Sequence, residues 1–363
     1  MKNDNLPHRQ LALFSGTASP YYSVPFPSTR YQGSKRKLTA WIWDNVASLE
    51  FDTVLDVFGG TGAVSHLFKR YGKEVAYNDY LVFNWNVGLA LIENASVTLT
   101  LEDVDAAIKK RVNVDYPDLI QTHFQGIYFT DAENAWLDAA VHNINTLFED
   151  VYKQALARFA LYQACIAKRP YNLFHRANLY MRQAAVERSF GNKATWDTPF
   201  EAHFRAFVTE ANTAVFDNHR HNRAIQLDAF ETPIGADLVY LDPPYLNANG
   251  VGVDYYDFYH FLEGLTDYPA WAEKIDFVSK HRRLIPQPSL WHNAGTILEA
   301  FEALIERHRK SILVISYRDD GIPSKEELIG LLRKVKKEVH QAELSQKYVL
   351  SKKNSHEILL IGV

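Results

Sequence analysis

Short apolar runs that end abruptly are the clearest pattern along the chain. One of them, residues 236–241, stops at the tetrapeptide Asp242-Pro243-Pro244-Tyr245. A short apolar run rich in Val, Leu and Tyr predicts a strand buried in a parallel sheet, and two successive prolines end it because neither can donate to the ladder. The tetrapeptide is therefore expected to form a rigid loop at the carboxyl end of a strand, where open α/β sheets place their ligands.

The same pattern predicts further strands at residues 53–56, 74–78, 226–230 and 311–317. Helical spacing of apolar residues begins at Leu38 and recurs through most of residues 80–225. Two alternating runs at 347–350 and 357–361, separated by a Lys-Lys-Asn turn, predict an edge hairpin. Strands interspersed with helices predict an α/β fold.

With 363 residues, the chain is long enough for one core domain plus a substantial insertion. Residues 1–27 contain four prolines and predict an irregular N-terminal arm. We expect the core domain to comprise residues 28–95 and 226–363, and residues 96–225 to form a helix-rich insertion between these two parts.

The tetrapeptide offers three groups that suit one chemical task. Asp242 supplies a carboxylate, Pro243 a carbonyl whose direction the double proline fixes, and Tyr245 a flat ring. The carboxylate and the carbonyl can accept two hydrogen bonds from an exocyclic amine while the ring stacks on the base that carries it. The alternative is an ordinary Pro-Pro turn after a strand.

A second strand end carries an acid and a glycine cluster. The strand at 53–56 ends at Asp56 and is followed by Phe58, Gly59, Gly60 and Gly62. A strand, a tight glycine turn and a helix form a nucleotide-binding unit, because glycine lets the backbone approach the ligand. The spacing differs from the dinucleotide G-x-G-x-x-G, and the acid and the ring suit a cofactor with a charged amino group. The alternative is a purely structural glycine turn.

Two flanking segments carry parts for the same cofactor. Asp79 follows the strand at 74–78, and an acid about 20 residues beyond a glycine turn can clamp two ribose hydroxyls. Residues 30–35 (Arg-Tyr-Gln-Gly-Ser-Lys) form a glycine turn that leads into a helix, and such a turn can hold a carboxylate or phosphate. Taken alone, the 30–35 turn is better explained as a plain helix cap.

The insertion carries a local excess of positive charge. The chain has a formal net charge of −4, yet residues 160–225 contain nine Lys or Arg against five Asp or Glu. A basic region on an acidic body is typical of a protein that meets a polyanion on one face. Cations, amides and aromatics are interleaved here, and the candidate DNA contacts are Lys168, Arg169, Asn172, Arg176, Asn178, Asn192 and Lys193. The alternative is an amphipathic helical cap with incidental arginines.

Composition excludes several other classes of protein. Hydrophobic residues make up 47% of the chain and aromatics 13%, as expected of a well-packed globular protein. No apolar run approaches the length of a membrane span and no secretory leader is present, so we expect neither a membrane protein nor a secreted one. Cys165 is the single cysteine, which excludes intrachain disulfides and cysteine-based zinc sites and favours a cytoplasmic protein with metal-free chemistry.

Taken in order, the 30–35 turn, the loop from Asp56 to Gly62, Asp79 and the tetrapeptide resemble the motifs of the Dam-type (alpha-group) N6-adenine DNA methyltransferases. The resemblance spans most of residues 30–362 and implies a seven-stranded, Rossmann-like methyltransferase sheet with an inserted target-recognition domain. Two motifs depart from the family pattern: K-W-x-G-G-K is here Arg-Tyr-Gln-Gly-Ser-Lys, and D-P-F is here Asp-Val-Phe. Both motifs keep the acid, the ring and the lysine.

The resemblance also implies that S-adenosylmethionine binds across the glycine loop. Carried over residue by residue, Tyr31 and Lys35 hold the methionine end, and Asp56 and Phe58 line it. Asp79 takes the ribose hydroxyls, and Asp228 and Phe230 take the cofactor adenine.

These observations lead to the hypothesis that the chain methylates the N6 amine of an adenine flipped out of double-stranded DNA. The enzyme would belong to a restriction-modification system or be a solitary or phage methylase. Within the enzyme class the alternatives are an N4-cytosine or an RNA-adenine methyltransferase, since any flipped amine could use the same three groups. From another class, the chain could be a catalytically inactive, sequence-specific DNA-binding protein. We expect a monomer, with a cognate restriction endonuclease as a candidate partner.

Overall fold

The computed structural model describes residues 20–184, 193–247, 249–346 and 355–363. Its centre is a seven-stranded sheet in the order β3-β2-β1-β4-β6-β9-β8. The first five strands in that order are parallel, whereas β9 is antiparallel to both of its neighbours. In chain order the strands are β1 (Thr53–Asp56), β2 (Glu74–Asn78), β3 (Arg223–Ile225), β4 (Leu238–Leu241), β6 (Ile312–Arg318), β8 (Val339–Gln346) and β9 (Ser355–Gly362). This architecture confirms the predicted Rossmann-like α/β fold.

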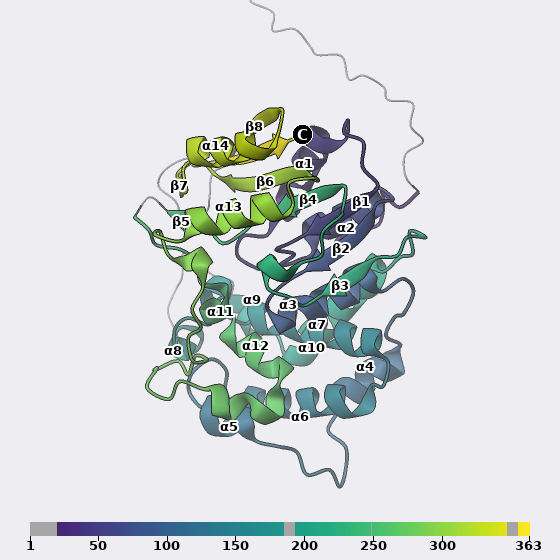
Figure 1. The fold of residues 1–363 in the computed structure, drawn as a ribbon. Coiled ribbons are helices and arrows are strands. Elements are labelled where there is room, and N and C mark those ends of the chain that lie inside the picture. Colours follow the sequence, from purple (N-terminus) through teal and green to yellow (C-terminus); the bar gives the residue numbers. More distant parts are fainter. Residues whose placement is uncertain (1–19, 185–192, 248, 347–354) are drawn as a thin grey trace, which may run out of the picture.

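Helices cover both faces of the sheet (Figure 1). Val54 and Leu238 face the side of α1 (Thr39–Val46) and α2 (Ala63–Arg70). Their neighbours Leu55 and Val239 face the side of α13 (Ile297–Arg307) and α14 (Lys325–Val335). Burial on both faces explains why these strands are apolar without alternation.

The remaining helices form a lobe on one side of the sheet, in the lower half of Figure 1. They are α3 (Val82–Gly88), α4 (Leu101–Ile108), α5 (Leu119–His123), α6 (Asp131–Leu147), α7 (Val151–Ala167), α8 (Leu179–Gln183), α9 (Lys193–Asp197), α10 (Phe200–Ala214), α11 (Tyr255–Phe258) and α12 (His260–Thr266). The short segments are η1 (Lys35–Lys37), η2 (Leu89–Glu93), η3 (Pro170–Asn172), η4 (Ala229–Glu231), η5 (Tyr268–Lys274), η6 (Leu290–His292) and the strand pair β5 (Leu246–Asn247) and β7 (Gly321–Ile322). In the described part of the chain, no helix has the length and apolar character of a membrane span.

The helical lobe contains residues that precede the tetrapeptide in the sequence and residues that follow it. Phe261 of α12 packs at 5.1 Å between ring centroids against Phe124 and at 5.5 Å against Tyr128, both from the predicted insertion. Conversely, β3 lies within residues 96–225 but pairs with β2 in the central sheet. The division into a core domain and an insertion stays a prediction.

Most strand predictions are confirmed, and one is wrong. The run at 226–230 is not a strand: β3 ends at Ile225, and Asp228 instead caps the turn η4 by accepting a hydrogen bond from Phe230 N at 2.9 Å. This local cap competes with the ladder for the backbone. The strand β9 includes the predicted run 357–361, but its antiparallel partner is 339–346, and residues 347–350 lie outside the described part.

Part of the predicted N-terminal arm is described, from residue 20 onward. Residues 20–27 contain no helix or strand, and Arg70 of α2 donates to the carbonyls of Tyr22 and Val24, each at 3.3 Å. These residues therefore lie over α2, and residues 1–19 are outside the described part.

The sheet changes direction between β1 and β4. From β1 the chain moves outward through β2 to β3, and it returns to β4 on the other side before continuing to β6. The carboxyl ends of β1 and β4 therefore flank a crevice, which is the usual ligand position in open α/β sheets.

Candidate functional site

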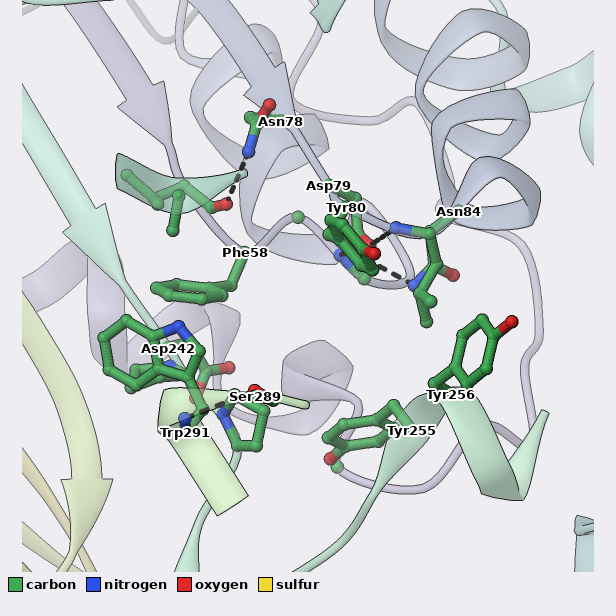
Figure 2. A pocket seen from close by; sticks show the side chains of 18 of the residues that line it. Phe58, Asn78, Asp79, Tyr80, Asn84, Asp242, Tyr255, Tyr256, Ser289 and Trp291 are labelled. Atoms are coloured by element: carbon green, nitrogen blue, oxygen red, sulfur yellow. Dashed lines mark hydrogen bonds between the residues drawn. The ribbon is translucent and has the colours of Figure 1, made fainter. Parts of the chain in front are cut away.

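A cavity of about 320 Å³ lies at this crevice and contains nearly all of the predicted site. Figure 2 shows Phe58 and Trp291 on one side of its open centre, and Asp79, Tyr255 and Tyr256 on the other. The predicted residues that line it are Tyr31, Lys35, Asp56, Phe58, Gly59, Gly60, Asp79, Asp228, Phe230, Asp242, Pro243, Pro244 and Tyr245. Predicted residues up to 214 positions apart in the sequence therefore meet in one cavity, from Tyr31 to Tyr245.

Two positions of the glycine loop require glycine, each for a different structural reason. A Cβ at Gly59 would lie 2.1 Å from the ring of Tyr77, so any side chain there would displace that ring. Gly62 has a φ of 75° and precedes α2 as its N-cap, a conformation that favours glycine. Gly62 therefore shapes the loop but does not itself line the cavity.

Asp56, at the end of β1, has one oxygen engaged and one free of protein donors. Its Oδ2 accepts a hydrogen bond from Ser65 Oγ at 2.6 Å, whereas its buried Oδ1 has no hydrogen-bond partner in the described residues. Burial raises the pKa of Asp56 to about 7, against the lowering effect of the Ser65 hydrogen bond. Oδ1 can therefore accept a hydrogen bond from a ligand in the cavity.

Asp79, after β2, is held in place by the protein. Its Oδ2 accepts from Gly60 N at 2.8 Å and from Asn84 Nδ2 at 3.1 Å, and its Oδ1 accepts from Leu81 N at 2.9 Å. Burial raises the pKa of Asp79 to about 6, although these hydrogen bonds act in the opposite direction. The contacts fix the carboxyl group at the cavity wall.

The ring of Tyr31 packs nearly parallel to the rings of two other tyrosines. Its ring centroid lies 4.4 Å from that of Tyr259 and 5.5 Å from that of Tyr255, with interplanar angles of 7° and 4°. Gly33 makes room for this stack, because a Cβ there would lie 2.4 Å from the Tyr255 hydroxyl. The aromatic stretch 254–261 thus flanks the cavity, through Tyr255 and Tyr256.

A second aromatic cluster forms the opposite wall. The ring of Phe230 lies nearly parallel to Trp291, with centroids 5.8 Å apart and an angle of 9°. Phe58 meets the same indole edge to face at 5.0 Å and 84°. Two predicted cofactor residues therefore converge on Trp291, which the sequence analysis did not single out.

Asp242 is part of a buried network of charges. Its Oδ1 accepts a hydrogen bond from the Tyr245 hydroxyl at 2.6 Å and lies 3.0 Å from Lys35 Nζ. Lys35 Nζ also contacts the Tyr245 hydroxyl and lies 3.3 Å from Oε1 of Glu357 on β9. Three protein groups thus surround the ammonium of a lysine predicted to hold the cofactor.

The two carboxyl groups share that one ammonium. Burial alone would lower the pKa of Lys35, but Asp242 and Glu357 outweigh it and raise the pKa. Burial raises the pKa of Asp242, Lys35 opposes this shift, and Glu357 adds to it. Asp242 is therefore a stronger proton acceptor than an exposed aspartate.

Sequence reasoning missed Trp291, Asn84 and Glu357. Trp291 follows a stretch without periodicity, and Asn84 lies inside an ordinary helix. Glu357 was in a predicted strand, and an acid within an otherwise apolar run was the one available signal.

Three predicted DNA contacts have to be corrected. Lys168, Arg169 and Asn178 are 1%, 1% and 3% exposed, so a polyanion at the surface cannot reach them. Lys168 donates to Trp196 O and Thr198 O and pairs with Glu133 Oε1 at 2.9 Å.

Arg169 is held in the same way by backbone carbonyls. Its guanidinium donates to Leu173 O, Tyr128 O and Arg176 O at 3.0 to 3.3 Å. It also lies 4.2 Å from the centroid of the Tyr128 ring. Cations in the insertion were counted as surface charge, but these two hold loops together.

The other predicted DNA contacts differ in position. Arg176 and Lys193 are exposed, and Lys193 pairs with Asp197 at 2.5 Å. Asn172 is half-buried with a φ of 60°. Asn192 lies outside the described residues.

Comparison with known proteins identifies the family. A model of the D12 class of N6 adenine-specific DNA methyltransferases matches residues 31–286. The chain is 30% identical over 340 residues to the Type II methyltransferase M2.HphI of Haemophilus parahaemolyticus, covering 92% of this chain and 95% of that protein. It is 25% identical over 324 residues to the Type II methyltransferase M.NlaIII of Neisseria lactamica, covering 84% and 86%.

A third relative is longer. The modification methylase StsI of Streptococcus sanguinis is 25% identical over 358 residues, which cover 91% of this chain and 51% of that protein. The family match decides against the alternatives of an N4-cytosine enzyme, an RNA-adenine enzyme and an inactive binding protein. Methyltransferases of this type generally use S-adenosylmethionine. The chain belongs to the D12 class of N6-adenine-specific DNA methyltransferases, and its activity is the methylation of adenine in DNA.

Proposed function

We propose that the methylated adenine is flipped out of double-stranded DNA into the cavity at the β1–β4 crevice, next to S-adenosylmethionine held by the glycine loop. The observation that carries this proposal is the meeting of the loop after β1 with the tetrapeptide after β4 in one cavity. A cofactor on the first loop and a base on the second would lie side by side, as in-line transfer requires. A base inside the duplex could not reach either loop.

The cavity residues fit the cofactor at three places. Asp56 Oδ1 lacks a donor and suits the cofactor's ammonium group. Asp79 Oδ1 accepts one described hydrogen bond and has capacity for a ribose hydroxyl. Phe230 and Trp291 offer ring faces to the cofactor adenine. When bound, S-adenosylmethionine supplies an electrophilic methyl group on its sulfonium.

Asp242 and Pro243 activate the target amine. Tyr245 and Lys35 both contact Oδ1 of Asp242, whereas no described residue donates to Oδ2. The amine donates one hydrogen to Oδ2 and the other to the Pro243 carbonyl, which favours a tetrahedral nitrogen and localises its lone pair toward the methyl group. The methylated nitrogen then loses a proton, for which Asp242 is the adjacent acceptor.

Tyr245 has two tasks in this proposal. Its ring lines the cavity, where the flipped base would stack, and its hydroxyl holds Asp242 in position. Pro244 keeps both groups on one rigid turn.

Lys35 and Glu357 position Asp242 rather than touch the substrate. Lys35 holds Asp242 Oδ1, and Glu357 competes with Asp242 for the same lysine ammonium. The methionine-end role predicted for Lys35 would require it to give up one of these protein partners.

Arg176, Lys193 and Asn172 stay candidate DNA contacts, because none of the three is fully buried. The Type II names of the relatives support a restriction-modification context with a cognate endonuclease. Action as a monomer and metal-free chemistry remain part of the proposal.

The test combines product mapping with one variant. Sequencing that reports modified bases on DNA treated with the protein should find N6-methyladenine at one short sequence. Asp242→Ala should abolish that signal, since loss of a preorganised charge acceptor costs on the order of a hundredfold or more in rate. Calorimetry should still detect S-adenosylmethionine binding to this variant. Near-normal turnover by Asp242→Ala would contradict the assignment of Asp242.

A further inference from the structure

Residues 276–285, here called the basic loop, project from the helical lobe as an ordered, closed loop. Its two ends are joined by a β-bridge between Ile275 and Leu284. Asp276 N donates to Arg283 O at 2.8 Å, and Ile285 N donates to Lys274 O at 2.9 Å. The protein thus fixes the shape of this loop without help from a ligand.

Apolar side chains are exposed on the basic loop. Val278 is 94% exposed, Ile285 55% and Phe277 50%. Single exposed apolar residues are common, but three within nine positions of one fixed loop concentrate apolar surface that a partner would bury favourably.

The same loop carries positive charge that the protein does not neutralise. Arg283 pairs with Asp276 at 3.2 Å and lies 3.9 Å from Asp257. Lys280 and Arg282 have no ion pair with any described residue. Half-buried Arg282 instead donates a hydrogen bond to Phe277 O at 2.5 Å and lies 5.2 Å from the centroid of the exposed Phe277 ring, which places its cation beside these apolar side chains.

The basic loop is connected to the cavity by sequence and by contact. The residues that follow it, 287–292, line the cavity. His281 Nε2 lies 3.7 Å from Asp257 on α11, the helix that brings Tyr255 and Tyr256 to the cavity wall. In Figure 1 the loop projects on the same side of the molecule as β5, which follows the catalytic tetrapeptide.

We propose that the basic loop is a contact surface for duplex DNA beside the flipped adenine, with Lys280 and Arg282 on backbone phosphates and Val278 against the exposed base or sugar edges. Charge complementarity favours DNA, because unpaired cations suit a polyanion. An apolar tip also suits a duplex that has lost one stacked base, since neighbouring ring faces become accessible there. The inference rests on the proposed base flipping and adds a surface that the sequence analysis did not predict.

The chain offers a matched control in another loop. Lys110 and Arg111 are exposed and precede Val112, which is 87% exposed. This segment follows α4, away from the basic loop in Figure 1, and contributes nothing to the described lining of the cavity. Like the basic loop, this segment combines two cations with an exposed valine, but it does not lie next to the cavity.

The first experiment measures DNA affinity at several salt concentrations. Each lost phosphate contact reduces the slope of log affinity against log salt by about 0.9. The double variant Lys280→Ala/Arg282→Ala should lose one to two such steps while S-adenosylmethionine affinity stays unchanged. The control Lys110→Ala/Arg111→Ala should keep the parent slope. Equal slopes for both double variants would overturn the proposal.

The second experiment tests the apolar tip with DNA that carries 2-aminopurine at the target position. Val278→Ala should keep the salt slope and reduce the fluorescence gained on base flipping at least twofold, whereas Val112→Ala should change neither. Fluorescence equal to that of the parent would remove Val278 from the interface.

The 2-aminopurine signal of the parent protein separates the loop proposal from the proposed base flipping. If the parent's fluorescence rises on binding and the loop variants behave like the controls, only the basic loop proposal fails. If the parent's fluorescence does not rise, the proposed base flipping fails as well.

Discussion

Charged groups in the cavity and in the helical lobe have different sets of partners, as half-buried Glu133 of the lobe and buried Asp56 of the cavity show. In the lobe, Glu133 accepts from Arg182 at 2.7 and 2.9 Å and from Thr130 N, and it pairs with Lys168. In the cavity, Asp56 Oδ1 has no described donor. Burial raises the pKa of both acids, but Arg182 and its neighbours outweigh burial and lower the pKa of Glu133, whereas the pKa of Asp56 is raised to about 7.

The difference separates structural charge from functional charge. A buried ion whose partners all lie within the chain holds the fold together, and ligand binding gives it nothing more. A buried ion without a full set of partners gains its partner from a ligand, at a cost to the empty protein. Composition alone cannot make this distinction, because both kinds of residue are counted as charged.

The largest effect should come from Lys168, in the lobe. Lys168→Met removes one partner of Glu133, which keeps Arg182, and takes the ammonium donor from the carbonyls of Trp196 and Thr198. Leaving a buried acceptor unpaired typically costs about 1 to 3 kcal/mol of unfolding free energy. Urea denaturation should show this loss. DNA bound per folded molecule, and its salt dependence, should not change. A stable variant with a reduced salt slope would restore Lys168 as a DNA contact.

Glu357→Gln should have the next largest effect, on the rate of methyl transfer. Without the second carboxylate, Lys35 interacts fully with Asp242 and lowers its pKa, so the proton acceptor weakens. We expect about a tenfold lower kcat, by analogy with the loss of a general acid–base contribution. The acidic limb of the pH–rate profile should move to lower pH, while KM for S-adenosylmethionine stays constant.

Two outcomes would contradict this role for Glu357. A parallel fall in kcat and thermal stability without any shift of the pH profile would indicate a structural role only. Unchanged single-turnover kinetics would remove Glu357 from the network.

Asp56 should make cofactor affinity depend on pH. Its pKa in the empty cavity is raised to about 7, so its carboxylate forms as pH rises through that value. If the ammonium group needs the carboxylate, S-adenosylmethionine should bind about tenfold more weakly at pH 6 than at pH 8, since about a tenth of the groups are ionised at pH 6. Calorimetry across this range is the measurement. Asp56→Asn should bind weakly and lose the pH dependence, and a retained dependence would place the titrating group elsewhere.

The smallest effect is expected from Arg176, the exposed neighbour of Arg169. Arg176→Ala removes charge but no interior contact, so stability should change by less than about 0.5 kcal/mol. The salt slope of DNA binding should fall by about 0.9 if Arg176 meets a phosphate. An unchanged slope would leave the basic loop as the better candidate for the interface.

Local patterns predicted the parts of the site that are built from single strand ends. The strands that end at Asp56 and at Leu241 were predicted, because burial, glycine and proline leave local signals. The roles of Lys168 and Glu357 were not, since each depends on a partner far away in the sequence. Lys168 meets Glu133 through the packing of helices, and Glu357 on β9 meets Lys35 of η1.

The 3.3 Å contact between Lys35 and Glu357 joins residues 322 positions apart. Closing a loop of that length has an entropic cost, which the finished sheet must offset. Until β9 pairs with β6, Asp242 has Lys35 as a partner but lacks the second carboxylate that shares the ammonium. Full methylation activity would therefore report that this edge of the sheet is complete.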